Sequence, residues 1–288
     1  MKPHRLVYLG SPEAAVPPLH ALVAGGFDVA LVVSQPDKKR GRGSGLSPSP
    51  VKAAALELGL PVTDVVDDAI EVGADLGVVV AFGRLIKPHV LDRLPMVNLH
   101  FSLLPRWRGA APVERALLAG DGETGVDVMQ LEEGLDTGGI YAEERLAIGA
   151  EETADELRDR LVAVGTDLLV RTLSAELGEP TPQVGEPTYA SKIDPAELEL
   201  QWNRPAVELH RLVRLGRAWT TFRGKRLKVL SARLAPSEAG PGVLDGLVVG
   251  TGDGGLELVT VQPEGKGPQD ASAWRNGTRP EPHERLGG

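Results

Sequence analysis

The sequence predicts a doubly wound, mostly parallel α/β domain followed by a small β-barrel domain. In the first half, near-continuous runs of Val and Leu alternate with helical patterns, which is typical of parallel strands buried on both faces. After residue 205, short apolar runs are separated by Gly and Pro, which favours an antiparallel barrel. The 288 residues, 42% of them hydrophobic, suffice for two domains with cores of their own.

The first domain is expected to span 1–177. Its predicted strands cover 6–9, 29–33, 76–80, the region around Asn98, 126–131 and 139–148. Its predicted helices cover 17–24, 50–58, 88–92, 112–119 and 153–176. Thr153 and Glu156 have the spacing of a capping box at the start of the last helix. This order predicts a Rossmann-like sheet with its ligand crevice at the carboxyl ends of the strands.

The remainder divides into a linker and a second domain. Residues 178–204 are rich in Pro, Glu and Thr, and are expected to connect the domains. Residues 205–288 are expected to form the OB-like barrel, with a helix at 206–215 and strands at 226–232, 242–250 and 255–261. The Gly- and Pro-rich stretch 263–288 is expected to be loosely ordered.

Composition excludes several classes of protein. The chain has no cysteine, so disulfide scaffolds, thiolate metal sites and cysteine nucleophiles are excluded. No apolar run approaches the roughly 18 residues of a membrane span, and no secretory signal is evident. We therefore expect a cytoplasmic protein without membrane contact. The sequence shows no oligomerisation segment, which makes a monomer the expected state.

Positive charge is concentrated in two segments, although the net charge is -9. Lys38, Lys39, Arg40 and Arg42 lie in one predicted loop. The segment 204–233 holds nine Lys or Arg residues against the single acid Glu208. These charges have two interpretations, a solvated surface or a local face that binds a polyanion.

Polar side chains gather where an apolar strand runs into a turn. Alternation puts Asn98, His100 and Ser102 on one strand face that leads to Pro105, and Asp136 lies on a second, glycine-flanked loop. Each residue alone has an ordinary structural explanation, such as a cap, a core histidine or an Asx turn. Together, an amide, an imidazole and a carboxylate are the groups needed to transfer an acyl group to an amine.

Other catalytic schemes fit less well. Ser102 is followed by leucines, whereas a nucleophile elbow needs glycine, so direct attack by the acceptor amine is favoured over a covalent intermediate. The segment 10–12 lacks the glycines of a dinucleotide site, and 41–45 lacks the Walker lysine. The six histidines show no metal-ligand spacing, so no metal is expected.

These motifs resemble those of the folate-dependent formyltransferases. The resemblance rests on Asn98-x-His100-x-Ser102-Leu103-Leu104-Pro105, on Arg108-Gly109 and on 134–138 (Gly-Leu-Asp-Thr-Gly). Within that family, the basic loop, the extended motif 102–112 and the C-terminal barrel are most similar to the branch that formylates methionyl-tRNA. The likeness covers nearly the whole chain.

The resemblance implies a role for each group of residues. It makes Asn98, His100 and Asp136 the catalytic trio, with 10-formyltetrahydrofolate as the formyl donor. The implied folate-binding residues are Ser102, Leu103, Leu104, Pro105, Phe82, Arg84, Leu85 and Ile86. The implied contacts with methionyl initiator tRNA are Lys38, Lys39, Arg40, Arg42, Arg214, Arg217, Arg223 and Lys225. Phosphates of the acceptor stem require such cations on adaptable backbone.

Three alternatives stay open at this point. A sugar-nucleotide N-formyltransferase would use the same trio but has no evident need for the basic loop. A formyltetrahydrofolate hydrolase would replace the amine with water, although a barrel argues against it. An RNA-binding module without activity would leave the trio without a purpose.

Overall fold

The structure is a computed structural model that describes residues 2–39 and 45–287. It divides into two compact units. The first comprises Met1–Val113, Glu123–Ala147 and Arg158–Ser191, and the second comprises Glu114–Gly122, Ile148–Leu157 and Lys192–Gly288. The segment 178–204, expected to be a linker, is thus divided between the two units after Ser191.

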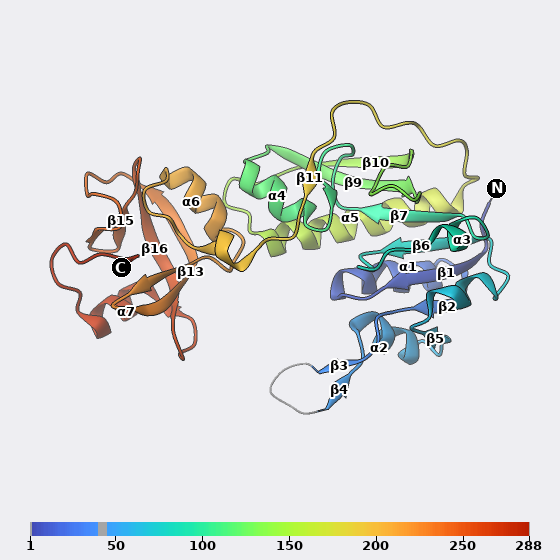
Figure 1. Ribbon diagram of the computed structural model, residues 1–288, viewed down its shortest axis with the longest axis horizontal. Coiled ribbons are helices and arrows are strands. Elements are labelled where there is room, and N and C mark those ends of the chain that lie inside the picture. The colour runs from blue at the N-terminus through green and yellow to red at the C-terminus, as the bar shows by residue number, and fades with distance from the viewer. Residues whose placement is uncertain (1, 40–44, 288) are drawn as a thin grey trace. The chain divides into compact units, whose positions relative to one another are not determined.

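A seven-stranded sheet forms the centre of the first unit as far as the structure describes it (Figure 1). Its spatial order is β10-β9-β7-β6-β1-β2-β5. The bounds are β1 (Arg5–Gly10), β2 (Asp28–Val33), β5 (Val62–Thr63), β6 (Leu76–Val80), β7 (Met96–His100), β9 (Glu123–Gln130) and β10 (Ile140–Ala147). The five strands from β7 to β5 pair in parallel, whereas β9 and β10 are antiparallel. The predicted mostly parallel sheet is confirmed.

Burial explains why the central strands read as uninterrupted apolar runs. All five residues of β6 are buried, and four consecutive residues of β1, 6–9, have no exposed surface.

The helices and 3-10 turns of this half of the chain are η1 (Glu13–Ala15), α1 (Val16–Ala24), α2 (Pro50–Glu57), η2 (Val66–Ile70), α3 (Pro88–Leu91), α4 (Pro112–Ala119) and α5 (Ala154–Ser174). The Ser49 hydroxyl caps α2 by accepting the N–H of Lys52 at 3.0 Å.

The start of α5 has the predicted capping box. The Thr153 N–H donates to the Glu156 carboxylate at 2.9 Å, and the Glu156 N–H donates back to the Thr153 hydroxyl at 3.3 Å. Two small sheets complete this part of the chain. The bounds are β3 (Lys38–Lys39) with β4 (Leu46–Ser47), and β8 (Arg108–Gly109) with β11 (Tyr189–Ala190).

An antiparallel sheet dominates the second unit, consistent with the predicted small barrel. Its order within the described residues is β12-β13-β16-β15-β14, with β17 also paired to β16. The bounds are β12 (Trp219–Phe222), β13 (Lys225–Ala235), β14 (Leu244–Asp245), β15 (Val248–Gly250), β16 (Gly255–Pro263) and β17 (Gln269–Asp270). The accompanying helical segments are η3 (Pro195–Leu198), α6 (Ala206–Val213) and α7 (Ala271–Thr278).

The expectation of a loosely ordered C-terminal stretch is wrong. Residues 263–288 contain β17 and α7, and Trp274 of α7 is buried with an edge-on ring contact to Phe222 at 5.1 Å. The buried Trp274 side chain, the pairing of β17 with β16 and backbone hydrogen bonds of Glu284 and Leu286 to residues 242–244 together order this Gly- and Pro-rich segment. Across the described residues, no helix is both long and apolar enough to cross a membrane.

Candidate active site

Strand β7 carries two of the three predicted catalytic side chains. Asn98 is partly buried and His100, the last residue of the strand, is 5% exposed. Because they are two residues apart, their side chains project from the same face of the sheet. Ser102 lies beyond the end of the strand in a bend, so the sequence alternation continues only as far as His100.

The hydrogen bonds of His100 determine its tautomer. Its Nε2 lies 3.0 Å from the carbonyl oxygen of Trp107, which can only accept, so Nε2 carries the proton. Nδ1 then has a free lone pair in the neutral ring, and it lies 3.8 Å from Oδ2 of Asp136. Burial lowers the pKa of His100 below 6.5, although the Asp136 charge and the Trp107 carbonyl oppose that shift. His100 is therefore a neutral base at neutral pH.

Asp136 is held on the loop between β9 and β10. Its backbone is left-handed, with φ of 51°, and its Oδ2 accepts the N–H of Gly109 at 2.7 Å. Gly109 has φ of 124°, and a Cβ there would lie 2.9 Å from the carbonyl oxygen of Ala190. Glycine is required at 109 for the backbone N–H to reach the carboxylate. The Asp136 side chain is 12% exposed, so one edge of this pair faces solvent.

The turn at 102–105 follows His100 directly. The Ser102 hydroxyl donates to the Arg106 carbonyl at 2.6 Å and is fully buried, so it closes the turn rather than pointing outward. Leu104 is buried, whereas Leu103 and Pro105 are partly exposed. Of the predicted folate-binding side chains in this turn, these two have surface available to a ligand.

The segment after β6 lies beside this turn in the sheet order, because β6 and β7 are parallel neighbours. Phe82 and Ile86 belong to the hydrophobic core, so only their backbone is available to a ligand. Arg84 donates to the carbonyl of Asp64 at 2.7 Å, and Leu85 is 81% exposed. Both strands end at the same edge, which brings together the two groups of predicted folate-binding residues.

Sequence reasoning missed a segment, residues 181–190 (the strap), that contacts both the loop carrying Asp136 and the segment 107–109. Gln183 donates to the carbonyls of Asp136 and Gly138, each at 2.8 Å, and accepts from Arg108 at 2.5 and 3.1 Å. Thr188 accepts the N–H of Trp107 on its hydroxyl at 2.9 Å. In the sequence, residues 181–190 have the polar composition of an ordinary loop. Nothing in that composition marks Gln183 as different from the other polar residues of the loop.

Asp127 is the second residue that sequence reasoning missed. It pairs with His100 across β7 and β9, has no exposed surface, and accepts the N–H of Leu104 at 2.7 Å. Its Oδ1 is buried without a hydrogen-bond partner, and burial raises the pKa of this carboxyl to about 7. An acid within the apolar run 125–130 was the signal in the sequence.

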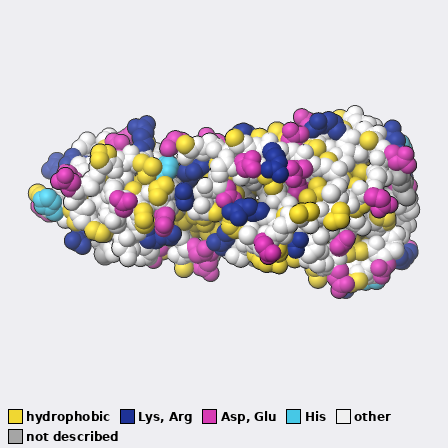
Figure 2. All heavy atoms as spheres, turned by 90° about the horizontal axis from the view of Figure 1, so that it is seen from above, with side chains coloured by type: hydrophobic (Ala, Val, Ile, Leu, Met, Phe, Trp, Pro, Cys, Tyr) yellow, Lys and Arg dark blue, Asp and Glu magenta, His cyan; other side chains and the backbone are white. Residues whose placement is uncertain are grey.

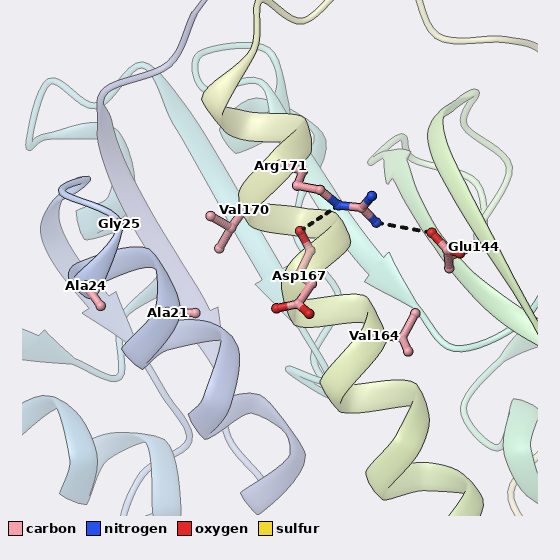
Figure 3. Close-up of a pocket in the computed structure, with 8 residues that line it drawn as sticks. All are labelled: Ala21, Ala24, Gly25, Glu144, Val164, Asp167, Val170 and Arg171. Carbon is pink, nitrogen blue, oxygen red and sulfur yellow. Dashed lines mark hydrogen bonds and ion pairs between the residues drawn. The ribbon is translucent and has the colours of Figure 1, made fainter.

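The site is distinct from a surface cavity between α1 and α5 (Figure 3). That cavity has a volume of about 790 Å³ and is bordered by small apolar side chains and by Arg171, which bonds Glu144 of β10 at 3.1 Å. None of the predicted catalytic or folate-binding residues lines it.

The predicted cationic residues have different environments. Lys38 is exposed on β3, Lys39 follows it, and Arg40 and Arg42 lie outside the described residues. Arg214 is 9% exposed and donates to the carbonyls of Glu152 and Gly149, each at 2.7 Å. That guanidinium ties α6 to the segment before α5 and has little surface for a ligand.

The other three cations lie at the surface of the second unit. Arg217 and Arg223 have side chains about half exposed, and Arg223 makes a bidentate pair with Glu284 at 2.6 and 2.8 Å. Lys225 is exposed at the start of β13. On the face shown in Figure 2, Lys and Arg side chains lie among Asp and Glu rather than in one uniform patch.

Comparison with known proteins identifies the family. Residues 4–173 match the formyl transferase domain, and residues 192–279 match the formyl transferase C-terminal domain. The chain belongs to the formyl transferase family. It is therefore a formyl-transferring enzyme, and the His100 site lies in the domain that defines this family.

Relatives of this formyltransferase match most of its length. It is 48% identical to methionyl-tRNA formyltransferase of Dinoroseobacter shibae, over 93% of this chain and 95% of that one. Its fold matches an N-formyltransferase of Helicobacter canadensis with a TM-score of 0.70, at 19% identity over 90% and 99% of the two chains. It also matches methionyl-tRNA formyltransferase of Clostridium thermocellum with a TM-score of 0.59, at 14% identity over 80% and 93%.

Proposed function

We propose that this formyltransferase moves the formyl group of 10-formyltetrahydrofolate to the amino group of methionyl initiator tRNA. The observation that supports the proposal is the 3.8 Å pairing of the buried His100 with Asp136, with Asn98 two residues earlier on the same face of β7, in a chain whose relatives over more than 90% of its length are methionyl-tRNA formyltransferases. A folate donor accords with the Helicobacter canadensis neighbour, whose structure holds folinic acid. A reaction on aminoacylated tRNA implies a cytoplasmic enzyme, and we expect a monomer.

Asn98 is the proposed donor to the developing oxyanion. The amine attacks the formyl carbon, a carbon–nitrogen bond forms, and the carbonyl oxygen gains negative charge. A fixed amide N–H directed at that oxygen typically contributes about 100- to 1000-fold in rate. The Nε2–H of His100 is already donated to Trp107, so the oxyanion role rests on Asn98 rather than on the imidazole.

His100 is the proposed proton acceptor. The attacking amine loses a proton to Nδ1, and the imidazolium that forms is stabilised by Asp136, 3.8 Å away. The proton then passes to N10 of the folate as the bond between the formyl carbon and N10 breaks. The products are formylated methionyl-tRNA and tetrahydrofolate. Asp136 thus acts by supporting the charge on His100, and Gly109 fixes its carboxylate.

The donor is proposed to bind along the edge where β6 and β7 end. The available groups there are the partly exposed Leu103 and Pro105, the exposed Leu85, and the backbone at Phe82 and Ile86. Apolar side chains with a few backbone polar groups suit a flat heteroaromatic ring. Arg84 has its guanidinium 5.7 Å from the Phe82 ring and adds a positive charge for an anionic tail.

Cations of the basic loop and of the second unit are proposed to bind the tRNA backbone. The proposed contacts are Lys38, Lys39, Arg40, Arg42, Arg217, Arg223 and Lys225. Arg214 is omitted because its guanidinium is buried against backbone carbonyls. Asp37, the acid nearest the basic loop in sequence, is paired with Lys52 at 2.7 Å, which reduces its repulsion of phosphate.

The deciding experiment measures formyl transfer from 10-formyltetrahydrofolate to methionyl initiator tRNA, with dTDP-amino sugars as the competing acceptors. The proposal requires transfer to tRNA that weakens steeply between 50 and 200 mM salt, as multiple phosphate contacts demand. His100→Ala serves as the inactive control. Transfer to an amino sugar with none to tRNA would make the sugar-nucleotide alternative correct.

A further inference from the structure

We infer that Gln183 is a positioning residue for Asp136, so that the strap 181–190 is a working part of the active site rather than a connection. The inference rests on the proposed function only for its kinetic test. Gln183 makes four hydrogen bonds, two donated and two accepted, to groups that lie between 45 and 75 residues away in the sequence.

The two donated bonds act on the loop that carries the carboxylate. The Gln183 amide donates to the carbonyls of Asp136 and Gly138, each at 2.8 Å. Asp136 has φ of 51°, a conformation that a non-glycine residue keeps only when its surroundings hold it. A primary amide can satisfy two carbonyls at once, and no other neutral side chain of similar length offers two donors and an acceptor.

The two accepted bonds act on the segment 108–109, which holds the Asp136 carboxylate. The Gln183 oxygen accepts from Nε and Nη2 of Arg108, at 3.1 and 2.5 Å. Arg108 precedes Gly109, whose N–H binds the Asp136 carboxylate. Gln183 thus fixes the Asp136 backbone on one side and the donor to its side chain on the other. Each contact lies within the first unit.

The strap is held at both ends around Gln183. Thr181 and Ile140 exchange backbone hydrogen bonds of 2.8 and 2.9 Å, and β11 pairs with β8 at Arg108 and Gly109. Between them the side chains of Val184 and Glu186 are exposed, and Gln183 is partly buried. The strap therefore spans from the Asp136 loop to the Gly109 loop, and Gln183 is its side chain that bonds to both.

Two substitutions separate the donated bonds from the accepted bonds. Gln183→Glu keeps an acceptor for Arg108 but directs a carboxylate at two carbonyl oxygens, whereas Gln183→Ala removes all four bonds. Both are expected to lower kcat about 10- to 100-fold, with the KM values for both substrates changed less than about threefold, because misplacing a catalytic group affects the transition state most. Val184→Ala, an exposed neighbour on the strap, is expected to leave kcat unchanged.

A double-mutant cycle with Asp136→Asn distinguishes positioning from general support of the fold. If Gln183 acts through Asp136, Gln183→Ala costs less than about threefold in the Asp136→Asn background. Equal losses in both backgrounds, or full activity of Gln183→Glu, would overturn the inference. NMR titration of His100 needs no substrate, and Gln183→Ala is expected to lower its pKa as Asp136→Asn does. An unchanged His100 pKa overturns the inference even if the proposed acceptor is wrong.

Discussion

The Asp127 carboxylate on β9 accepts the backbone N–H of Leu104 at 2.7 Å, and so ties the sheet to the turn that follows His100. The carboxyl is fully buried, its other oxygen has no partner, and its pKa is raised to about 7. Glu143, the register partner of Asp127 on β10, adds a small repulsion in the same direction, and Arg145 opposes it. A titrating group therefore lies under the predicted folate-binding turn.

Asp127→Asn is expected to remove a pH dependence of stability. The folded protein retains a proton that the unfolded chain releases near pH 3.8, so the free energy of unfolding falls as pH rises from about 4 to 7 and then levels. The contribution is up to about 4 kcal/mol, from the size of the shift. Asparagine still accepts the Leu104 N–H but carries no charge, so urea unfolding of the variant shows a flatter profile.

The matched control is Asp245→Asn, at an exposed position on β14. We expect its pH profile to follow that of the parent protein. A parent whose stability does not fall between pH 4 and 7, relative to Asp127→Asn, would contradict the assignment of this titration to Asp127.

Asp136→Asn is expected to lower the pKa of His100. Burial alone pushes that pKa below 6.5, and the Asp136 charge partly restores it, so removing the charge moves the titration to lower pH. In the parent, activity is expected to fall as pH drops through the His100 pKa, because a protonated Nδ1 could not take the proposed proton from the amine. NMR titration of the imidazole measures both values, and a higher pKa in the variant would refute the pairing.

Asn98→Ala is expected to reduce kcat about 100- to 1000-fold with little change in either KM, since an oxyanion donor acts mainly in the transition state. Single-turnover formyl transfer isolates the chemical step from tRNA release. Asn203→Ala, an exposed amide of the second unit, is the control and should keep parental kcat. A large rise in the KM for the formyl donor at constant kcat would instead make Asn98 a binding residue.

The sequence predicted those features that depend on local pattern. The parallel sheet was predicted because its strands are apolar on both faces. The capping box at Thr153 was predicted because its two residues are three positions apart. His100 and Asp136 were predicted as site residues because their chemistry is uncommon in apolar or glycine-rich surroundings, and the structure places them 3.8 Å apart. The contacts of Gln183 could not be predicted from the sequence, because its hydrogen-bond partners lie 45 to 75 residues away along the chain. The burial of Arg214 could not be predicted either, since the sequence does not distinguish an arginine bound to backbone carbonyls from one exposed to solvent.

Trp274→Ala is expected to destabilise the second unit by about 3–5 kcal/mol, because it removes a buried aromatic side chain and its contact with Phe222. The loss should release α7 and expose the C-terminal stretch to protease, whereas Arg275→Ala, at an exposed position on the same helix, should not. The proposed formyl-donor site lies in the first unit, so donor binding should stay at the parental level. Calorimetry, limited proteolysis and donor titration test these outcomes together, and a parental melting temperature for Trp274→Ala would mean that α7 does not stabilise the sheet.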